Sequence, residues 1–159
     1  MKNLTIKSDF KVYQLEELPL VDQNLIAQAK EACKTSYSPY SNFAVGAAAQ
    51  LENGTVVTGS NQENAAFPSG LCAERTTLFY ANSTYPDQGV ETLAVAAYTN
   101  GHYLDSPIPP CGACRQVILE TEKRYNNPIR ILLYGEKEIY ECEGIRHLLP
   151  LSFTSGDMK

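Results

Sequence analysis

The sequence predicts a single α/β domain with a mixed five-stranded sheet and helices on both faces. The chain has 159 residues, and a domain holds about 150 residues. Apolar residues recur at helical spacing in some segments and form short continuous runs in others. The expected order of elements is helix, hairpin, helix, strand, helix, strand, and this order is typical of α/β proteins.

The first expected elements are a helix and a β-hairpin. Apolar residues recur at helical spacing from about 21 to 35, and a Ser/Pro/Asn cluster at 38–42 ends that pattern. A nearly continuous apolar run at 43–51 predicts a buried strand. The Asn53-Gly54 pair then favours a tight turn, and the segment 55–59 is expected to pair back as a second strand.

The second half of the chain alternates between helices and strands. Short apolar runs favour strands that are buried on both faces, whereas apolar residues three or four apart favour helices. The expected elements, in chain order, are a loop over 61–71, a helix over 72–82, a strand over 92–98, a proline-containing loop, a helix over 114–125, and strands over 129–134 and 138–143.

The N-terminal segment stands apart from this pattern. Residues 4–12 alternate loosely between apolar and polar, so they could form an edge strand or a mobile arm. We therefore expect an N-terminal extension over 1–18 and one main domain over 19–159. The first residues contain no apolar core of a secretory signal, so a cytoplasmic location is expected.

Charge and hydropathy exclude two classes of partner. Lys and Arg number 13 against 18 Asp and Glu, a net charge of −5. An acidic chain without a basic stripe releases few counterions from a nucleic acid, so no nucleic-acid polymer is expected as a partner. No stretch of 18 apolar residues occurs, so no membrane partner is expected either.

Cysteine spacing gives the first indication of chemistry. An odd number of cysteines argues against a disulfide framework, and the chain has five. Cys33 and Cys142 stand alone and are expected to be small buried hydrophobes. Cys111 and Cys114 form a C-x-x-C pair, which is typical of metal-binding or redox sites. Cys72 begins a predicted helix, as the pair does.

Three thiols at two helix starts predict a metal site. The positive end of a helix dipole favours thiolate over thiol. Thiolates select zinc, Cu(I) or iron–sulfur clusters, and zinc is the preferred interpretation. Three protein ligands would leave the fourth position of the metal open, as in catalytic zinc sites. The alternatives are a structural zinc site with a fourth protein ligand, or three buried thiols.

A carboxylate next to the cluster suggests a reaction. Glu74 follows two residues after Cys72, and the second half of the pattern is Pro110-Cys111-Gly112-Ala113-Cys114. This x-E and P-C-x-x-C arrangement is that of zinc deaminases, in which a glutamate moves protons between the attacking water and the leaving amine. The residues therefore predict hydrolytic deamination, with Glu74 as the catalytic residue.

These segments, taken with others in the same order, resemble cytidine deaminases of the small, three-cysteine, homotetrameric kind. The resemblance covers most of the chain and implies zinc-dependent deamination of cytidine and deoxycytidine in pyrimidine salvage. The matching segments are Ser38-Pro39-Tyr40-Ser41-Asn42-Phe43, Val45-Gly46-Ala47, Asn61-Gln62-Glu63-Asn64-Ala65, Cys72-Ala73-Glu74-Arg75, Pro110-Cys111-Gly112-Ala113-Cys114-Arg115-Gln116, and Leu148-Leu149-Pro150 with Phe153.

The resemblance also implies substrate contacts. Asn61 and Glu63 match a pair that hydrogen-bonds the 3′-hydroxyl of the sugar. Phe43 and Phe153 match aromatics that pack on the pyrimidine and sugar, Phe153 reaching in from a neighbouring subunit. The backbone of Ala73 matches the contact to the ring edge.

The remaining implications concern the metal. Zn²⁺ is expected at one ion per chain, held by Cys72, Cys111 and Cys114. Arg75 matches an arginine that hydrogen-bonds the thiolates. Because three thiolates and one zinc sum to −1, a guanidinium nearby would restore the Lewis acidity of the metal. A homotetramer with shared active sites is expected.

Each role has a simpler alternative, and so has the function. Glu74 could be a solvated surface group, Arg75 could form a surface ion pair, and Asn61 and Glu63 could be turn residues. Phe43 could be part of the core, and Phe153 a core or tail residue. The competing functions are deamination of another cytosine compound, such as blasticidin S, and a non-catalytic zinc or thiol redox protein. Gln62 and Phe67 depart from the pattern of the family, which affects the ligand preference.

Overall fold

The computed structural model describes residues 1–158, and Lys159, the last residue of the predicted domain, lies outside them. Three α-helices and a mixed sheet form the described part of the chain. The helices are α1 (Leu20–Ala32), α2 (Ala73–Thr84) and α3 (Gly112–Tyr125). The strands are β1 (Lys11–Tyr13), β2 (Ala44–Leu51), β3 (Val56–Ser60), β4 (Val90–Thr99), β5 (His102–Tyr103), β6 (Arg130–Tyr134) and β7 (Ile139–Glu143).

The sheet runs in the order β1-β7-β6-β4-β2-β3, and β5 pairs with β4. The pair β4–β6 is parallel, and the other pairs are antiparallel. The predicted mixed α/β domain is therefore confirmed. Within residues 1–158 the sheet has two short strands beyond the five expected: β1, which overlaps the end of the segment 4–12 that could form an edge strand, and β5. Each has too few residues for a periodic pattern, so pairing with a neighbouring strand rather than local sequence defines it.

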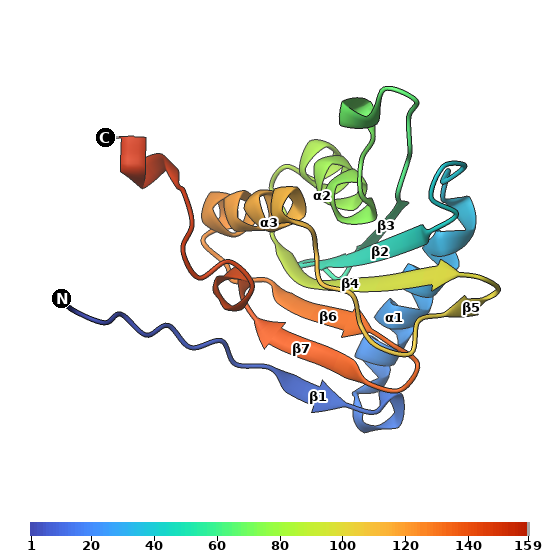
Figure 1. Cartoon of the computed structure of the whole chain (residues 1–159), viewed down its shortest axis with the longest axis horizontal. Coiled ribbons are helices and arrows are strands. Elements are labelled where there is room, and N and C mark those ends of the chain that lie inside the picture. Colours follow the sequence, from blue (N-terminus) through green and yellow to red (C-terminus); the bar gives the residue numbers. More distant parts are fainter. Residues whose placement is uncertain (159) are drawn as a thin grey trace.

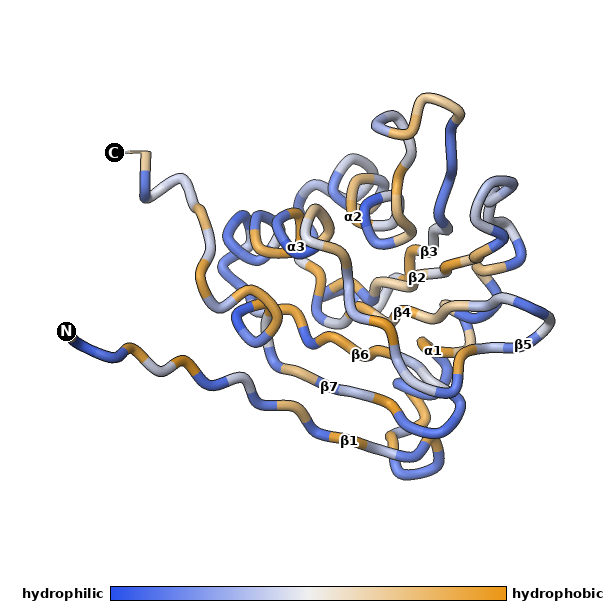
Figure 2. Tube along the Cα trace, in the orientation of Figure 1, coloured by the Kyte–Doolittle hydropathy of each residue, from blue (hydrophilic) through white to orange (hydrophobic). Residues whose placement is uncertain are grey.

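Helices cover both faces of the sheet, α1 on one and α2 with α3 on the other (Figure 1). Side chains alternate between the two faces along β2: Ala48 lies in the core cluster with Leu25, and Ala47 lies in the cluster with Leu78 and Ile118. Figure 2 shows apolar residues along β4 and β6, between the two layers of helices. The period of two in β2 thus supplies both layers from one strand.

Two glycines let the helices approach the sheet closely. A Cβ at Gly46 in β2 would lie 2.1 Å from the carbonyl oxygen of Ala29 in α1. A Cβ at Gly59 in β3 would lie 2.6 Å from Thr77 Oγ1 in α2. Both distances are too short for any side chain, so these positions require glycine. The second contact fixes the first half of α2 against the end of β3.

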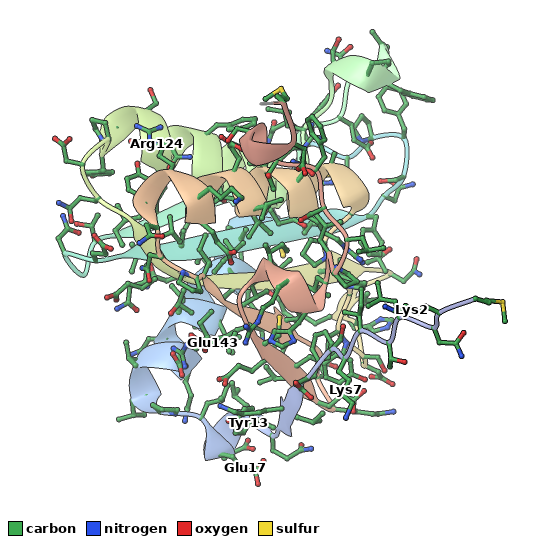
Figure 3. The ribbon with its side chains drawn as sticks, turned by 90° about the vertical axis from the view of Figure 1, so that its left-hand side faces the viewer. Lys2, Lys7, Tyr13, Glu17, Arg124 and Glu143 are labelled. Atoms are coloured by element: carbon green, nitrogen blue, oxygen red, sulfur yellow. The ribbon has the colours of Figure 1, made fainter. Side chains whose placement is uncertain are left out.

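The N-terminal segment is an edge strand over Lys11–Tyr13 and has no regular secondary structure before it. Lys11 pairs with Glu141 of β7 in the ladder, and the ring of Phe10 lies 6.4 Å from that of Tyr140. Figure 3 shows Lys2 and Lys7 on the part of the segment that runs outward from the body. No helix among residues 1–158 is both long enough and apolar enough to cross a bilayer.

The strand directions bring five segments to one edge of the sheet. Because β3 and β4 each run antiparallel to β2, they point the same way and end at the same edge. From that edge the chain passes through loops into the starts of α2 and α3. The start of β2 lies there too, since Gly46 pairs with Ser60 at the end of β3. Ligand sites of α/β folds form at such edges.

Candidate active site

Three thiols meet where α2 and α3 begin. The Sγ atoms of Cys72 and Cys111 are 3.6 Å apart, and those of Cys111 and Cys114 are 3.5 Å apart. All three lie within 4.8 Å of one another, and in the described residues no other His, Cys, Asp or Glu joins the group. Cys33 and Cys142 are buried elsewhere, as expected. The cluster therefore has three protein ligands and no fourth within residues 1–158.

Both helices begin at a ligand cysteine. Cys72 is the N-cap of α2 and Cys111 is the N-cap of α3, and Cys114 lies in the first turn of α3. The carbonyl of each N-cap accepts the first helical hydrogen bond, from Thr76 N at 3.0 Å and from Arg115 N at 2.9 Å. Two positive helix ends thus point at one spot, which stabilises negative charge on sulfur.

Hydrogen bonding shifts the pKa values of Cys72 and Cys114 in opposite directions. The thiol of Cys114 donates to Cys72, and this contact, together with Arg75, lowers the pKa of Cys72 to about 5. The same hydrogen bond and burial raise the pKa of Cys114 well above its usual range.

The donor set fits a zinc ion. A tetrahedral site with Zn–S bonds of about 2.3 Å separates its sulfurs by roughly 3.8 Å. The two sulfur–sulfur separations, 3.5 and 3.6 Å, are close to this value and far longer than a disulfide bond. Soft thiolates at helix N-termini are ligands that zinc prefers.

Two charged side chains flank the cluster. Glu74, in the first turn of α2, is 5% exposed, and burial raises the pKa of its carboxyl group. Arg75 Nη2 lies 3.8 Å from Cys72 Sγ and 3.4 Å from the carbonyl oxygen of Gly70. Glu74 is therefore a buried group beside the cluster and not a solvated one, and Arg75 places positive charge against a sulfur.

A cavity of about 700 Å³ opens above the cluster. Its volume lies in the range of small-molecule sites, which is about 300–1,000 Å³. Ile108 and Pro109 form one wall, while Tyr40 and Phe67, whose ring centroids are 5.8 Å apart, lie at an exposed side. The predicted residues that line it are Phe43, Asn61, Glu63, Cys72, Glu74, Arg75 and Cys111.

The amide of Asn61 is largely engaged by its own chain. Its Oδ1 accepts from Ser36 Oγ at 2.6 Å and from Val45 N at 2.8 Å, and its Nδ2 donates to the carbonyl oxygen of Phe43 at 2.9 Å. An amide nitrogen carries two hydrogens, so one N–H of Asn61 is left for a ligand.

Glu63 lines the same cavity as Asn61, and its carboxylate accepts three hydrogen bonds. Oε2 accepts from Tyr40 N at 2.9 Å and Ser41 N at 3.3 Å, and Oε1 accepts from Ser41 Oγ. These bonds, first among them that from Ser41, hold the pKa of Glu63 below its usual value. Glu63 thus offers acceptor lone pairs only, next to the single donor of Asn61.

Two predicted contacts lie apart from the lining. Ala73 is fully buried. Phe153 is 59% exposed and does not line the cavity of its own chain, and its carbonyl oxygen accepts from Gln116 Nε2 at 2.9 Å.

The structure adds site residues that sequence reasoning did not single out. Arg115 Nε donates to the carbonyl of Pro110 at 2.8 Å, and its Nη1 donates to the carbonyl of Leu148 at 2.6 Å, which ties the loop before Cys111 to the C-terminal segment. Ser41 contacts Glu63. Both lie inside segments that carried the resemblance, but nothing in the local pattern indicated these partners.

Comparison with known proteins agrees with this geometry. The model of the cytidine and deoxycytidylate deaminase zinc-binding region matches residues 20–126, which include all three cluster cysteines. The chain is 41% identical over 136 residues to the cytidine deaminase of Sporosarcina psychrophila, covering 86% of this chain and 93% of the relative. It is 42% identical over 137 residues to the cytidine deaminase of Halalkalibacterium halodurans, and the match covers 86% of this chain and 96% of the relative.

Solved structures show the same fold. The cytidine deaminase of Burkholderia pseudomallei superposes with a TM-score of 0.70 at 38% identity, covering 82% of this chain and 97% of that one. The cytidine deaminase of Mycobacterium tuberculosis superposes with a TM-score of 0.65 at 33% identity, and the match covers 82% of this chain and 95% of that one. The chain belongs to the cytidine and deoxycytidylate deaminase family, and its three-cysteine cluster binds zinc.

Removal of one thiol should remove the metal. Protein purified without added zinc is expected to carry about one zinc per chain, and Cys114→Ala is expected to lose most of it, because two ligands hold zinc poorly. Cys142→Ala is the matched control, since it also removes a buried thiol but should keep the metal. Metal analysis of both variants checks this, and a Cys114→Ala protein with a full equivalent of zinc would contradict the assignment.

Proposed function

We propose that this protein hydrolyses cytidine and deoxycytidine to uridine and deoxyuridine, with release of ammonia, as a zinc enzyme of pyrimidine salvage. The observation that carries the proposal is the buried Glu74 beside three convergent thiols at the floor of a nucleoside-sized cavity. Family membership supports the same reaction.

The reaction adds water at C4 of the pyrimidine, so a C–O bond forms and the C–N bond to the amine breaks. Zinc, when bound, supplies a Lewis acid that activates water. Glu74 accepts a proton from the attacking water, delivers it to ring N3, and carries the second proton to the leaving amine. Its position in the first turn of α2, two residues after Cys72, supports the use of one carboxylate in all three steps.

The sugar is held by Asn61 and Glu63. A hydroxyl group both donates and accepts, and the pair offers one free N–H and one carboxylate acceptor. This arrangement suits the 3′-hydroxyl and rejects a 3′-phosphate, which has no proton for Glu63 and would repel it. A free nucleoside is therefore favoured over a nucleic-acid polymer.

The base lies between the cluster and Phe43, which lines the cavity at the start of β2. The backbone of Ala73, buried beneath the site, contacts the ring edge. Arg75 offsets the negative charge of the thiolates through Cys72.

The cavity is completed by a second subunit. In a homotetramer, Phe153 of one chain covers the pyrimidine bound at the zinc of another. Leu151 and Phe153 are 73% and 59% exposed in the single chain, and the C-terminal tail runs outward (Figure 1). An exposed apolar tail of this kind is typical of an interface.

The extension 1–18 and the catalytic domain 19–159 are separate parts of this proposal. The family match begins at residue 20, which supports that boundary. The extension pairs with the sheet through β1, and Leu18 packs into the core cluster that contains Leu25 of α1. A cytoplasmic location stays a prediction.

The substrate assignment is tested by ammonia release. Cytidine and deoxycytidine should be turned over, whereas cytosine and blasticidin S should react at least about 100-fold more slowly, because each loses or alters the sugar that Asn61 and Glu63 recognise. Preferred turnover of blasticidin S would favour the competing deaminase activity, and a redox-active C-x-x-C without ammonia release would exclude deamination.

Glu74→Gln should abolish turnover and leave the metal. The amide keeps the shape but cannot carry protons, so kcat should fall by roughly 100- to 10,000-fold or more. Zinc analysis should still give a full equivalent. Glu120→Gln, at an exposed position of α3, is the matched control and should behave as the unaltered protein. Near-normal turnover of zinc-replete Glu74→Gln would place the base elsewhere.

A shortened tail should weaken substrate binding. A chain that ends at Leu151 is expected to show a KM for cytidine raised by about tenfold, since it loses the aromatic cover of the pyrimidine. A chain that ends at Ser155 keeps Phe153 and is the control. Light scattering and zinc analysis show whether the fold and assembly persist. A monomeric short chain with the full-length KM would refute a shared site.

A further inference from the structure

The turn before β2 has a fixed conformation. Asn42 has a φ of 54°, in the left-handed region, which asparagine adopts more readily than most residues. Its N–H donates to the carbonyl of Ser38 at 2.9 Å, and its own carbonyl accepts from Thr99 Oγ1 at 3.0 Å. The turn is thus closed on itself and anchored to the end of β4.

This conformation directs consecutive donors at one carboxylate. The N–H groups of Tyr40 and Ser41 both reach Oε2 of Glu63, at 2.9 and 3.3 Å, and the hydroxyl of Ser41 reaches Oε1. Successive backbone N–H groups form an anion-binding concavity, and hydrogen bonds to an ionised acceptor are the stronger kind. Glu63, which lies 22 residues further along the chain, is therefore held in one orientation from the turn.

The hydroxyl of Ser41 has one hydrogen-bond acceptor within reach, the carboxylate of Glu63. Phe43 N donates to Ser41 Oγ at 3.1 Å, so the oxygen is an acceptor on that side. Its hydrogen is left for Glu63. The serine side chain thus bridges the start of β2 and the carboxylate, and it does not have a free proton for a substrate.

We propose that Ser41 is a positioning residue that orients the carboxylate of Glu63 toward the 3′-hydroxyl of the nucleoside, and that it thereby sets the requirement for that hydroxyl. The backbone donors fix only Oε2, so the carboxylate can still turn about that oxygen. The hydroxyl of Ser41 binds Oε1 and stops this rotation. The proposal rests on the proposed function, since it needs a nucleoside in the cavity.

The test compares cytidine with 3′-deoxycytidine in Ser41→Ala. A lost hydrogen bond to a charged group should raise the KM for cytidine by about tenfold, with kcat changed less than about twofold, because sugar binding is common to the ground state and transition state. With 3′-deoxycytidine, which lacks the group that Glu63 binds, the same variant should match the unaltered protein within about twofold.

A double-mutant cycle gives an independent measure. In a Glu63→Ala background, Ser41→Ala should change kcat/KM for cytidine by less than about twofold, since the carboxylate it orients is gone. Ser41→Thr keeps the hydroxyl at an exposed position and should restore most of the binding. Ser83→Ala, at an exposed serine in α2, is the matched control. Zinc content reports on folding throughout.

The outcomes separate the two proposals. Equal losses with cytidine and 3′-deoxycytidine, or additive losses in the cycle, would overturn the role of Ser41 while leaving the deaminase activity in place. If the unaltered, zinc-replete protein does not deaminate cytidine, the proposed function is wrong and the role of Ser41 falls with it.

Discussion

The site depends on two helix N-termini that meet at one edge of the sheet. α2 and α3 each begin with a cysteine at the N-cap, so two positive dipole ends and three thiols converge. Thiolates repel one another strongly unless a cation lies between them. The helix ends and Arg75 reduce that repulsion, and the metal removes it. If either helix moved by a few ångströms, the three sulfurs would be too far apart to bind one metal ion.

The core holds the two helices at the distance that the cluster needs. Ala47 and Ala49 in β2 and Gly59 in β3 leave little side-chain volume between α2 and the sheet. α3 is held from its other end by Glu122, whose Oε1 accepts from Ile129 N at 3.0 Å and Ile145 N at 2.8 Å. Arg115 then joins the loop before Cys111 to Leu148. Packing far from the metal thus sets the geometry of its ligands.

In the proposed function, substrate specificity depends on the hydrogen-bonding positions of Asn61 and Glu63 that the chain itself does not use. Asn61 uses three of its four hydrogen-bonding positions within the chain, and Glu63 accepts three bonds from the turn before β2. A ligand therefore meets one fixed donor and one fixed acceptor. Because these groups are held before substrate arrives, little ordering remains to oppose binding. Among the described lining residues the one cationic side chain is Arg75, which already contacts Cys72.

Local sequence determined most of the helices and strands and the three-cysteine cluster. The tertiary structure decided how the strands pair and which residues line the cavity. The cysteines at the helix starts and the Asn53-Gly54 turn carry their own signals, because N-terminal turns and hairpins involve residues close in the chain. The substrate roles of Asn61 and Glu63 came from resemblance alone. The short strands β1 and β5 have too few residues to show a pattern. The hydrogen bonds of Arg115 with Leu148 and of Ser41 with Glu63 join residues that lie far apart in sequence. Such contacts depend on strand order, and strand order is a property of the whole fold.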